Sequence, residues 1–243
     1  MTTDIVAQIK THLSNPPLDE DGEPYAMKLL PPLDATAVTA LQARYNCTLT
    51  DDVKTLLAFC GGFENGALEN VDFQGEDAKW ILPSLNGRLI CIAPDGYGNF
   101  WCYWKTAVNA HLGPIYYYQH EGPMLFYQCP TLIDFVTEYL KFMTPPYHSL
   151  IDDVHEFRLK PLKDINRDCL TSAQAAASAN PLLQEFAASA PKDCVFYDFT
   201  ATKTGAGVDL KSYDVAAVHP EQPILALSPR QGLLQRIFGK RGK

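Results

Sequence analysis

Apolar positions near the start of the chain recur at the spacing of a helix. Ile5, Ile9 and Leu13 stand four residues apart, which places them on one face and predicts an amphipathic helix over residues 4–13. The proline-rich acidic stretch "NPPLDEDGEP" then breaks the pattern. Because prolines and clustered acids interrupt helices, we expect an exposed loop there.

Three further segments show helical spacing together with start signals. They are "PPLDATAVTALQARYNC", "TLTDDVKTLLAFCGG" and "TLIDFVTEYLKFM". Asp34, Thr50 and Thr131 stand where the N-cap residue of each helix is expected, because their side chains can accept from the first free backbone N–H groups. We expect Gly61 and Gly62 to end the second of these helices in the left-handed conformation.

Between residues 88 and 128 the hydrophobic period changes to two. "RLICIA" and "NFWCYW" are joined by "PDGYG", and "PIYYYQ" and "MLFYQ" by "HEGP", which predicts two β-hairpins. Alternation puts Trp101 and Tyr103 on one face and Phe100, Cys102 and Trp104 on the other. Both faces are therefore apolar or aromatic, so both need a cover. We expect helices on one face and, on the other, the C-terminal part in preference to a partner protein.

The C-terminal part differs in composition and in hydrophobic pattern. "TSAQAAASANPLLQEFAASAP" is alanine-rich and predicts helix, "CVFYDFTATKTGAGVDL" predicts a hairpin, and "PILALS" predicts a strand. The whole pattern predicts an α+β fold with a mostly antiparallel sheet and helices packed on it. We expect one domain over residues 1–147 and a smaller α+β extension over residues 148–243, whose end is basic.

Composition narrows the class of protein. Of the 243 residues, 47% are apolar and 20% are charged, which is typical of a globular chain with a core. No run of about 18 apolar residues predicts a membrane span, and the first residues lack the pattern of a signal peptide. The seven cysteines stand singly and form no CxxC pair, which argues against a zinc ribbon and a disulfide framework. We therefore expect a cytoplasmic protein.

The charge is strongly uneven along the chain. The net charge is −8, but the last fourteen residues hold five basic residues and no acid, which leaves a net of −13 on residues 1–229. A surface this acidic repels nucleic acid and attracts basic partners. For the basic tail we favour a solvated terminus over contact with a membrane or nucleic acid.

Motifs for catalysis or cofactor binding are weak. "DGYGN" lacks the spacing and the lysine of a phosphate-binding loop, and no G-x-S-x-G elbow is present. Cys102 with His111 or His120 is a conceivable nucleophile pair, but a cysteine in an apolar strand is more often an inert core thiol. The possible metal ligands lack a ligand spacing; they are His111, His120, Glu121, His148, Asp152 and His155. We therefore expect a protein that is not an enzyme and binds no metal or cofactor.

The order of these segments, over about residues 28–143, resembles the SUKH superfamily. A helix led by "LPP" is followed by "LTDDVKTLLAFCGGF", by the hairpin "IAPDGYGNFWCYW", by "YYYQHEG" and by the helix "TLIDFVTEYL". The family's usual "NGG", "G-D-G-x-G-D/N" and "DHE" correspond here to "CGG", "APDGYGN" and "QHE". The departures are Cys60 for Asn, Ala93-Pro94 before the Asp-Gly pair, and Gln119 for Asp. Residues beyond about 150 resemble no family.

This resemblance implies a non-enzymatic binding domain. Most bacterial members are similar to immunity proteins that neutralise toxins of the polymorphic toxin systems by direct binding, whereas eukaryotic members are regulators of the cell-wall type. The toxin, its chemistry and the oligomeric state stay open. The candidate partner contacts lie on an acidic loop expected over residues 64–77 (Glu64, Glu69, Asp72, Glu76 and Asp77), on the turn of the first hairpin (Asp95, Tyr97 and Asn99) and on the turn of the second hairpin (His120 and Glu121). For each, the alternative is a solvated loop charge or a turn-forming residue, and for Asp95 we favour that alternative.

Overall fold

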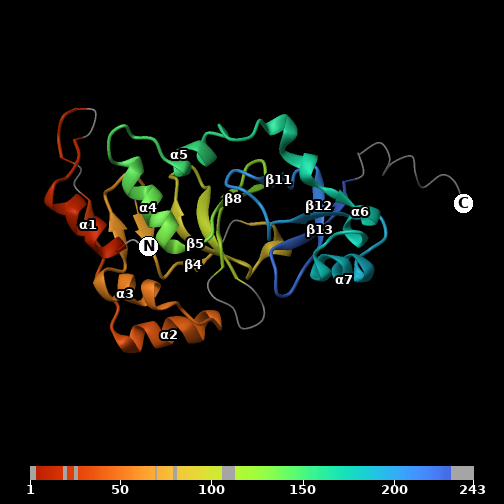
Figure 1. Cartoon of the computed structure of the whole chain (residues 1–243), viewed down its shortest axis with the longest axis horizontal. Helices are drawn as coiled ribbons and strands as arrows, with labels where there is room; N and C mark the ends of the chain where they lie inside the picture. The colour runs from red at the N-terminus through yellow and green to blue at the C-terminus, as the bar shows by residue number, and fades with distance from the viewer. Residues whose placement is uncertain are drawn as a thin grey trace, which may run out of the picture.

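The computed structural model describes residues 4–18, 21–24, 27–68, 70–78, 81–105 and 113–230. Its layers follow one another as helices, central sheet, second sheet and helices (Figure 1). The helices are α1 (Ile5–Ser14), α2 (Ala35–Tyr45), α3 (Asp51–Phe59), α4 (Leu132–Phe142), α5 (Leu150–His155), α6 (Ser172–Ala176) and α7 (Pro181–Ser189). Two short 3₁₀ turns are η1 (Pro83–Leu85) and η2 (Leu162–Asp168). In the ranges described, no helix has the length and apolar character needed to cross a membrane.

The predicted helix starts are confirmed. Asp34 accepts from the backbone N–H of Ala37 at 2.8 Å, and Thr131 accepts from that of Asp134 at 3.1 Å. Thr50 occupies the N-cap position of α3, but its hydroxyl bonds to the carboxylate of Asp52 and makes no capping bond to the helix backbone. The sequence pattern thus determines which residue occupies the N-cap position. Whether its side chain makes the capping hydrogen bond depends on the neighbouring side chains.

The expected glycine cap of α3 is wrong. The helix ends at Phe59, and Cys60, in an extended conformation, is its C-cap. Gly62 begins strand β2 with φ at 152°, and a Cβ there would lie 1.9 Å from the carbonyl oxygen of Val71. The glycine is therefore required by the close approach of a neighbouring strand and not by the helix end.

A six-stranded antiparallel sheet forms the centre, in the order β11-β8-β7-β6-β5-β4. Its strands are β4 (Glu76–Asp77), β5 (Leu89–Pro94), β6 (Phe100–Trp104), β7 (Ile115–Gln119), β8 (Met124–Cys129) and β11 (Gly207–Asp209). The two predicted hairpins, β5–β6 and β7–β8, are confirmed. A small sheet of β1 (Lys28–Leu29), β2 (Gly62–Glu64) and β3 (Asn70–Asp72) lies before it in the chain.

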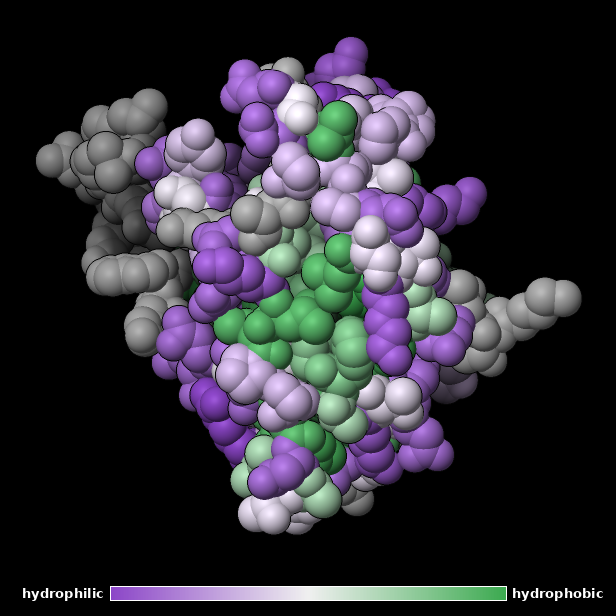
Figure 2. Space-filling model, turned by 90° about the vertical axis from the view of Figure 1, so that its left-hand side faces the viewer, coloured by the Kyte–Doolittle hydropathy of each residue, from purple (hydrophilic) through white to green (hydrophobic). Residues whose placement is uncertain are grey.

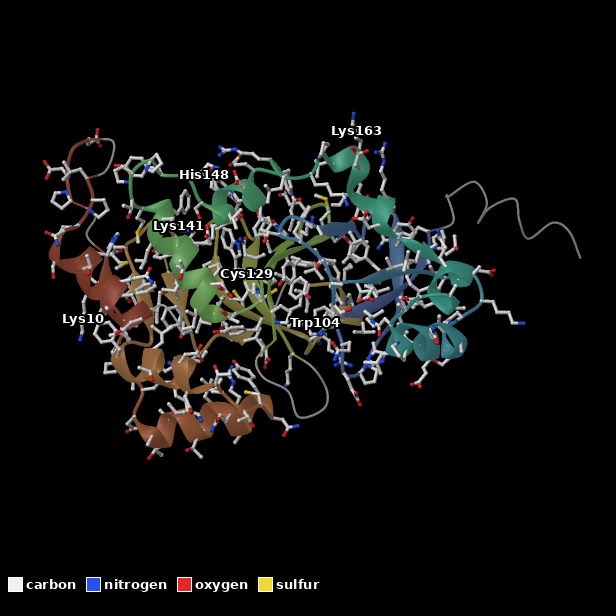
Figure 3. The ribbon with its side chains drawn as sticks, viewed as in Figure 1. Lys10, Trp104, Cys129, Lys141, His148 and Lys163 are labelled. Carbon is white, nitrogen blue, oxygen red and sulfur yellow. The ribbon has the colours of Figure 1, made fainter. Side chains whose placement is uncertain are left out.

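The two faces of the central sheet are covered by different parts of the chain. On the first face, Trp101, Tyr103 and Tyr117 pack among residues of α1–α5. On the second face, Trp104 and Tyr116 pack against residues 195–227. Figure 3 shows Trp104 toward the C-terminal part and Cys129 toward α4. The expected internal cover of the second face is confirmed.

The C-terminal part builds a second antiparallel sheet, in the order β12-β13-β10-β9. Its strands are β9 (Leu170–Thr171), β10 (Val195–Asp198), β12 (Tyr213–Val218) and β13 (Ile224–Pro229). The hairpin expected over residues 194–210 is wrong: β10 pairs with β13 and β9, whereas β11 pairs with β8 of the central sheet. Two antiparallel sheets with helices packed on them confirm the α+β class. The boundary at residue 147 stays a prediction. Strand β11, which follows it, pairs with β8, which precedes it, and residues from both sides form the core on the second face.

The alanine-rich segment is helical as predicted and forms two helices, α6 and α7. Asn180 accepts from the N–H of Leu182 and caps α7, and Pro181 occupies its first turn. Helices α6 and α7 then cover the outer face of the second sheet through Ala175, Leu183 and Phe186. This closes the layered structure at the end opposite α1 (Figure 1).

Candidate functional site

The turn of the β5–β6 hairpin is organised around one carboxylate. Oδ1 of Asp95 accepts from the backbone N–H groups of Tyr97 at 2.8 Å and Asn99 at 3.1 Å, and its Oδ2 accepts from Nδ2 of Asn99 at 2.7 Å. Gly96 and Gly98 have φ values of 82° and 87°, which favour glycine. The tip is therefore fixed by three hydrogen bonds to a single side chain.

The turn of the β7–β8 hairpin is joined to this tip. Oδ1 of Asn99 accepts from the backbone N–H of His120 at 3.0 Å and lies 3.1 Å from Nδ1 of its ring. A Cβ on Gly98 would lie 2.6 Å from that ring, so glycine allows the two turns to meet. Tyr97, 79% exposed, and the exposed Glu121 stand on these two turns.

Asp95 itself faces the interior. Its side chain is 2% exposed, Tyr117 donates to its Oδ2 at 3.0 Å, and Nε2 of His155 lies 3.4 Å from the same oxygen. Burial raises the pKa of Asp95, but hydrogen bonds from Asn99, Tyr97 and Tyr117 outweigh burial and hold the pKa below its usual value. Asp95 thus fixes the turn. This is the turn-forming role that we favoured over a partner contact for this residue.

The second group of candidate residues surrounds the turn between β3 and β4. Asp72 accepts from the N–H of Gln74 at 2.9 Å, and Gly75 has φ at 62°. Glu76 and Asp77, both exposed, then form β4, the edge strand of the central sheet. The structure therefore places two acids next to each other on a sheet edge.

Tyr45 of α2 anchors this acidic turn to the helices. Its hydroxyl donates to the carbonyl of Gly75 at 3.0 Å. Burial raises the pKa of Tyr45 to about 12; the charge of Arg44 opposes this shift, and the charges of Asp77 and Asp72 add to it. The acids thus lie close enough together to act on one buried phenol.

The segment expected as a single acidic loop, residues 64–77, contains three short strands, so that expectation is wrong. Glu64 ends β2, where it pairs with Asn70 of β3, and is exposed. Glu69 lies outside the described residues. The candidates therefore fall into a hairpin group (Asp95, Tyr97, Asn99, His120 and Glu121) and an acidic edge (Asp72, Glu76 and Asp77), with Glu64 on a separate sheet.

Strand β5 connects the hairpin group to the acidic edge. Glu76 pairs with Cys91 and Asp77 with Ile90 in the first half of the strand, and Asp95 directly follows its last residue. The acidic edge therefore pairs with the first half of β5, and the hairpin group begins at its end, although the two groups are separated in sequence. The sequence pattern did not identify β4, because two charged residues show no alternation.

Two side chains that complete the hairpin group were not assigned to it from the sequence. Tyr117 and His155 reach Asp95 from β7 and α5, and the ring of His155 also lies 5.9 Å from that of Trp101. Gln128, fully buried, accepts from Nε1 of Trp101 and donates to the carbonyl of Leu150. A lone glutamine in the apolar strand "MLFYQC" was the one signal for such a contact.

Cys102 does not offer a nucleophile on the surface. It is fully buried on the second face, its thiol donates to the carbonyl of Tyr116 at 3.5 Å, and burial raises its pKa well above the usual value. Of its two expected partners, His120 contacts Asn99 on the hairpin turns, and His111 lies outside the described residues. Within the ranges described, the structure brings no three His, Cys, Asp or Glu side chains together as metal ligands.

Residues 32–138 match the family model of the SMI1 / KNR4 family (SUKH-1). This stretch is a SUKH domain. The resemblance read from the segment order is confirmed, and the rest of the chain matches no family model. Neither the curated proteins nor the solved structures contain a match to this chain.

All ten candidate residues lie inside the SUKH domain, between Glu64 and Glu121. Helix α1 and everything from α5 onward lie outside it. His155, which contacts Asp95, is therefore supplied from outside the SUKH domain. The β5–β6 turn of the SUKH domain is therefore fixed by Asp95, and Asp95 is in turn contacted by His155 from the chain that follows the domain.

Proposed function

We propose that this chain is a bacterial immunity protein that neutralises a cognate toxin by direct binding in the cytoplasm. The SUKH family supports a protein that acts through protein–protein interaction. The observation that carries the proposal is the rigid hairpin tip, which exposes 79% of Tyr97 while its backbone is fixed by Asp95. An exposed aromatic side chain on a preorganised turn is a typical binding hot spot, because little conformational freedom is lost on binding.

The closed faces of the central sheet limit where a partner binds. Helices cover one face and residues 195–227 cover the other, so the aromatic strands are core. The surface left to a partner includes the hairpin tip and the acidic edge of Glu76 and Asp77. We therefore assign binding to these two groups, which lie beside and beyond strand β5.

Charge supports a basic partner. The net charge is −8, and an acidic protein captures a basic protein faster than a neutral one, since complementary fields raise the association rate. All seven cysteines are free thiols, which is consistent with a reducing compartment.

The first experiment is affinity capture of the tagged full chain from its native cells, with the partner identified by mass spectrometry. One stoichiometric partner with a toxic domain supports immunity, provided that co-expression of this chain restores growth to cells that make the toxin. Several weak partners without toxicity would instead support a regulatory module of the cell-wall type.

Variants then test the assigned surface. We expect Tyr97→Ala to weaken the complex about tenfold or more. Glu76→Lys with Asp77→Lys should lower the association rate, most strongly at low salt. The matched control is Glu185→Lys with Asp193→Lys, which makes the same charge change on exposed residues of the C-terminal part. If the control slows binding as much as the edge variant does, the acidic edge is not the contact.

A further inference from the structure

A groove of about 470 Å³ lies between α1 and α4, away from the hairpin group and the acidic edge. Its size is within the range of pockets that bind small molecules, about 300–1,000 Å³. Figure 2 looks onto the end of the molecule that α1 occupies, where an apolar area is surrounded by hydrophilic residues. Because α1 lies outside the SUKH domain, the groove is made partly by chain that the family model does not include.

Two polar side chains of α1 are left without partners in this groove. His12 is 8% exposed, and within the described part of the chain its Nε2 is buried with no hydrogen-bond partner. Nε2 of Gln8 is in the same state. The two residues are four apart and so lie on one face of the helix. Buried polar atoms without hydrogen-bond partners are uncommon in folded proteins, and two such atoms next to a groove indicate a site for a polar partner.

The three hydroxyls of the groove have their hydrogens engaged. The hydroxyls of Thr11, Thr137 and Thr144 each donate to the carbonyl four residues earlier. Lys141 adds a positive charge, although its ammonium also contacts Glu138 at 2.7 Å. Among the described residues that line the groove, none is Asp or Glu, even though the chain is acidic overall. Gln8 therefore offers a free N–H, and His12 offers a second one when its Nε2 carries the hydrogen, in a groove whose described lining holds no acidic side chain.

We propose that this groove binds a small carboxylic acid with an apolar stem. The carboxylate accepts from Nε2 of Gln8 and Nε2 of His12, and the stem packs between α1 and α4 against Ala7 and Leu140. Ionised acceptors make the stronger hydrogen bonds, which offsets part of the cost of burying the carboxylate. This site is independent of the protein-binding surface proposed above.

The occupied groove has a measurable signature at His12. Burial lowers the pKa of His12, so the ring is neutral at pH 7. A carboxylate next to Nε2 favours the protonated ring and therefore raises that pKa. His12 and Lys141 are the titratable groups among the described lining residues, so the change is reported by one imidazole.

The test is a titration of the full chain, labelled with ¹⁵N-histidine, with sodium hexanoate, followed by NMR of the imidazole nitrogens. We expect a saturable shift at His12, a higher pKa of His12 in the bound state and no change at His148, which is 71% exposed. 1-Hexanol, which has the same stem and no charge, should bind about tenfold more weakly or worse. No saturable shift at His12, or equal binding of hexanol, would overturn the proposal.

Variants locate the carboxylate. His12→Leu removes the unpaired nitrogen and retains apolar contacts, so we expect a folded protein with about tenfold weaker hexanoate binding. Gln8→Leu should weaken binding in the same direction and serves if His12→Leu does not fold. Lys141→Ala weakens binding, whereas Lys163→Ala, at the other side of the molecule in Figure 3, leaves it unchanged. Unchanged affinity in folded His12→Leu and Gln8→Leu would contradict the assignment.

Discussion

The two faces of the central sheet differ in how their polar groups are satisfied. On the first face, Nε1 of Trp101 donates to Gln128 at 3.0 Å, and the hydroxyls of Tyr103 and Tyr117 donate to the carbonyl of Phe73 and to Asp95. On the second face, two buried polar atoms have no hydrogen-bond partner in the part of the chain described; they are Nε1 of Trp104 and the hydroxyl of Tyr116. Tyr118 differs from them, because its hydroxyl accepts from Leu82.

This difference indicates that the two covers are held in different ways. The first cover combines apolar packing with directional hydrogen bonds, which fix the position of each aromatic ring. The second cover relies on burial of apolar surface, which is strong but not directional. We therefore expect the stability of the second face to depend on the presence of any apolar cover. The stability of the first face should depend on particular hydrogen-bond partners.

The largest effect is expected from removing the second cover. A chain that ends after Arg158 keeps α5 of the first cover, loses β11 and exposes the buried Trp104, Tyr116 and Tyr118. Because an apolar patch of this size is not stable in water, we expect aggregation or loss of a cooperative thermal transition. The control ends after Arg230, which removes only the basic tail, and should unfold like the full chain. A soluble, cooperatively folded 1–158 fragment would contradict this prediction.

The two tryptophans of β6 separate the faces by hydrogen bonding. Trp101→Phe removes the donor to Gln128 and leaves a buried oxygen unpaired, so the free energy of unfolding should fall by about 2–4 kcal/mol. Trp104→Phe removes an N–H that has no acceptor among the described residues and should cost about 1–2 kcal/mol less. Urea unfolding of both variants measures the difference. Equal losses would remove the distinction between the faces.

Neighbouring tyrosines of β7 provide a smaller and cleaner comparison. Tyr117→Phe removes the hydroxyl that donates to Asp95 and should destabilise by about 1–2 kcal/mol. Tyr116→Phe removes a buried hydroxyl without a partner in the described ranges and should change stability by less than about 0.5 kcal/mol, or increase it. Urea midpoints at pH 7 distinguish the two. A greater loss in Tyr116→Phe would mean that its hydroxyl has a partner after all.

The smallest effect is a pH dependence from Asp95. Its pKa is lowered in the fold, so the ionised carboxylate stabilises the protein above the pKa of the unfolded chain, and this contribution is lost as the pH falls through the folded-state pKa. Wild type should therefore lose more stability than Asp95→Asn between about pH 5 and pH 3. Urea unfolding over this range tests it, and parallel curves for the two proteins would refute the role of the carboxylate.

The sequence predicted the local elements of the SUKH domain well, because local signals determine them. The Asp-Gly turn at Asp95, the N-caps Asp34 and Thr131, and the alternation in β6 each depend on residues close in the chain. The division of aromatic residues between the two faces followed from that alternation alone. Each of these features could be predicted from the spacing of apolar residues and from the turn or cap residues next to them.

The pairing of distant segments was not predictable in the same way. Strand β11 joins the central sheet across more than seventy residues, and the expected hairpin with β10 does not form. The contact of His155 with Asp95 likewise depends on where α5 packs. Short charged strands such as β4 carry no hydrophobic period, so the acidic candidates were assigned to a loop. The pairing of β11, the contact of His155 with Asp95 and the formation of β4 all depend on tertiary contacts.

The central claim is that residues 148–230 are part of the same cooperative structure as the sheet that they cover. Native-state hydrogen exchange of the full chain tests it most directly, by comparing the amides of Tyr116 in β7 and Leu225 in β13. We predict that both exchange through the same opening, with free energies within about 0.5 kcal/mol of each other. If Leu225 exchanges through an opening several kcal/mol lower while Tyr116 stays protected, the cover is a separate unit and the claim is wrong.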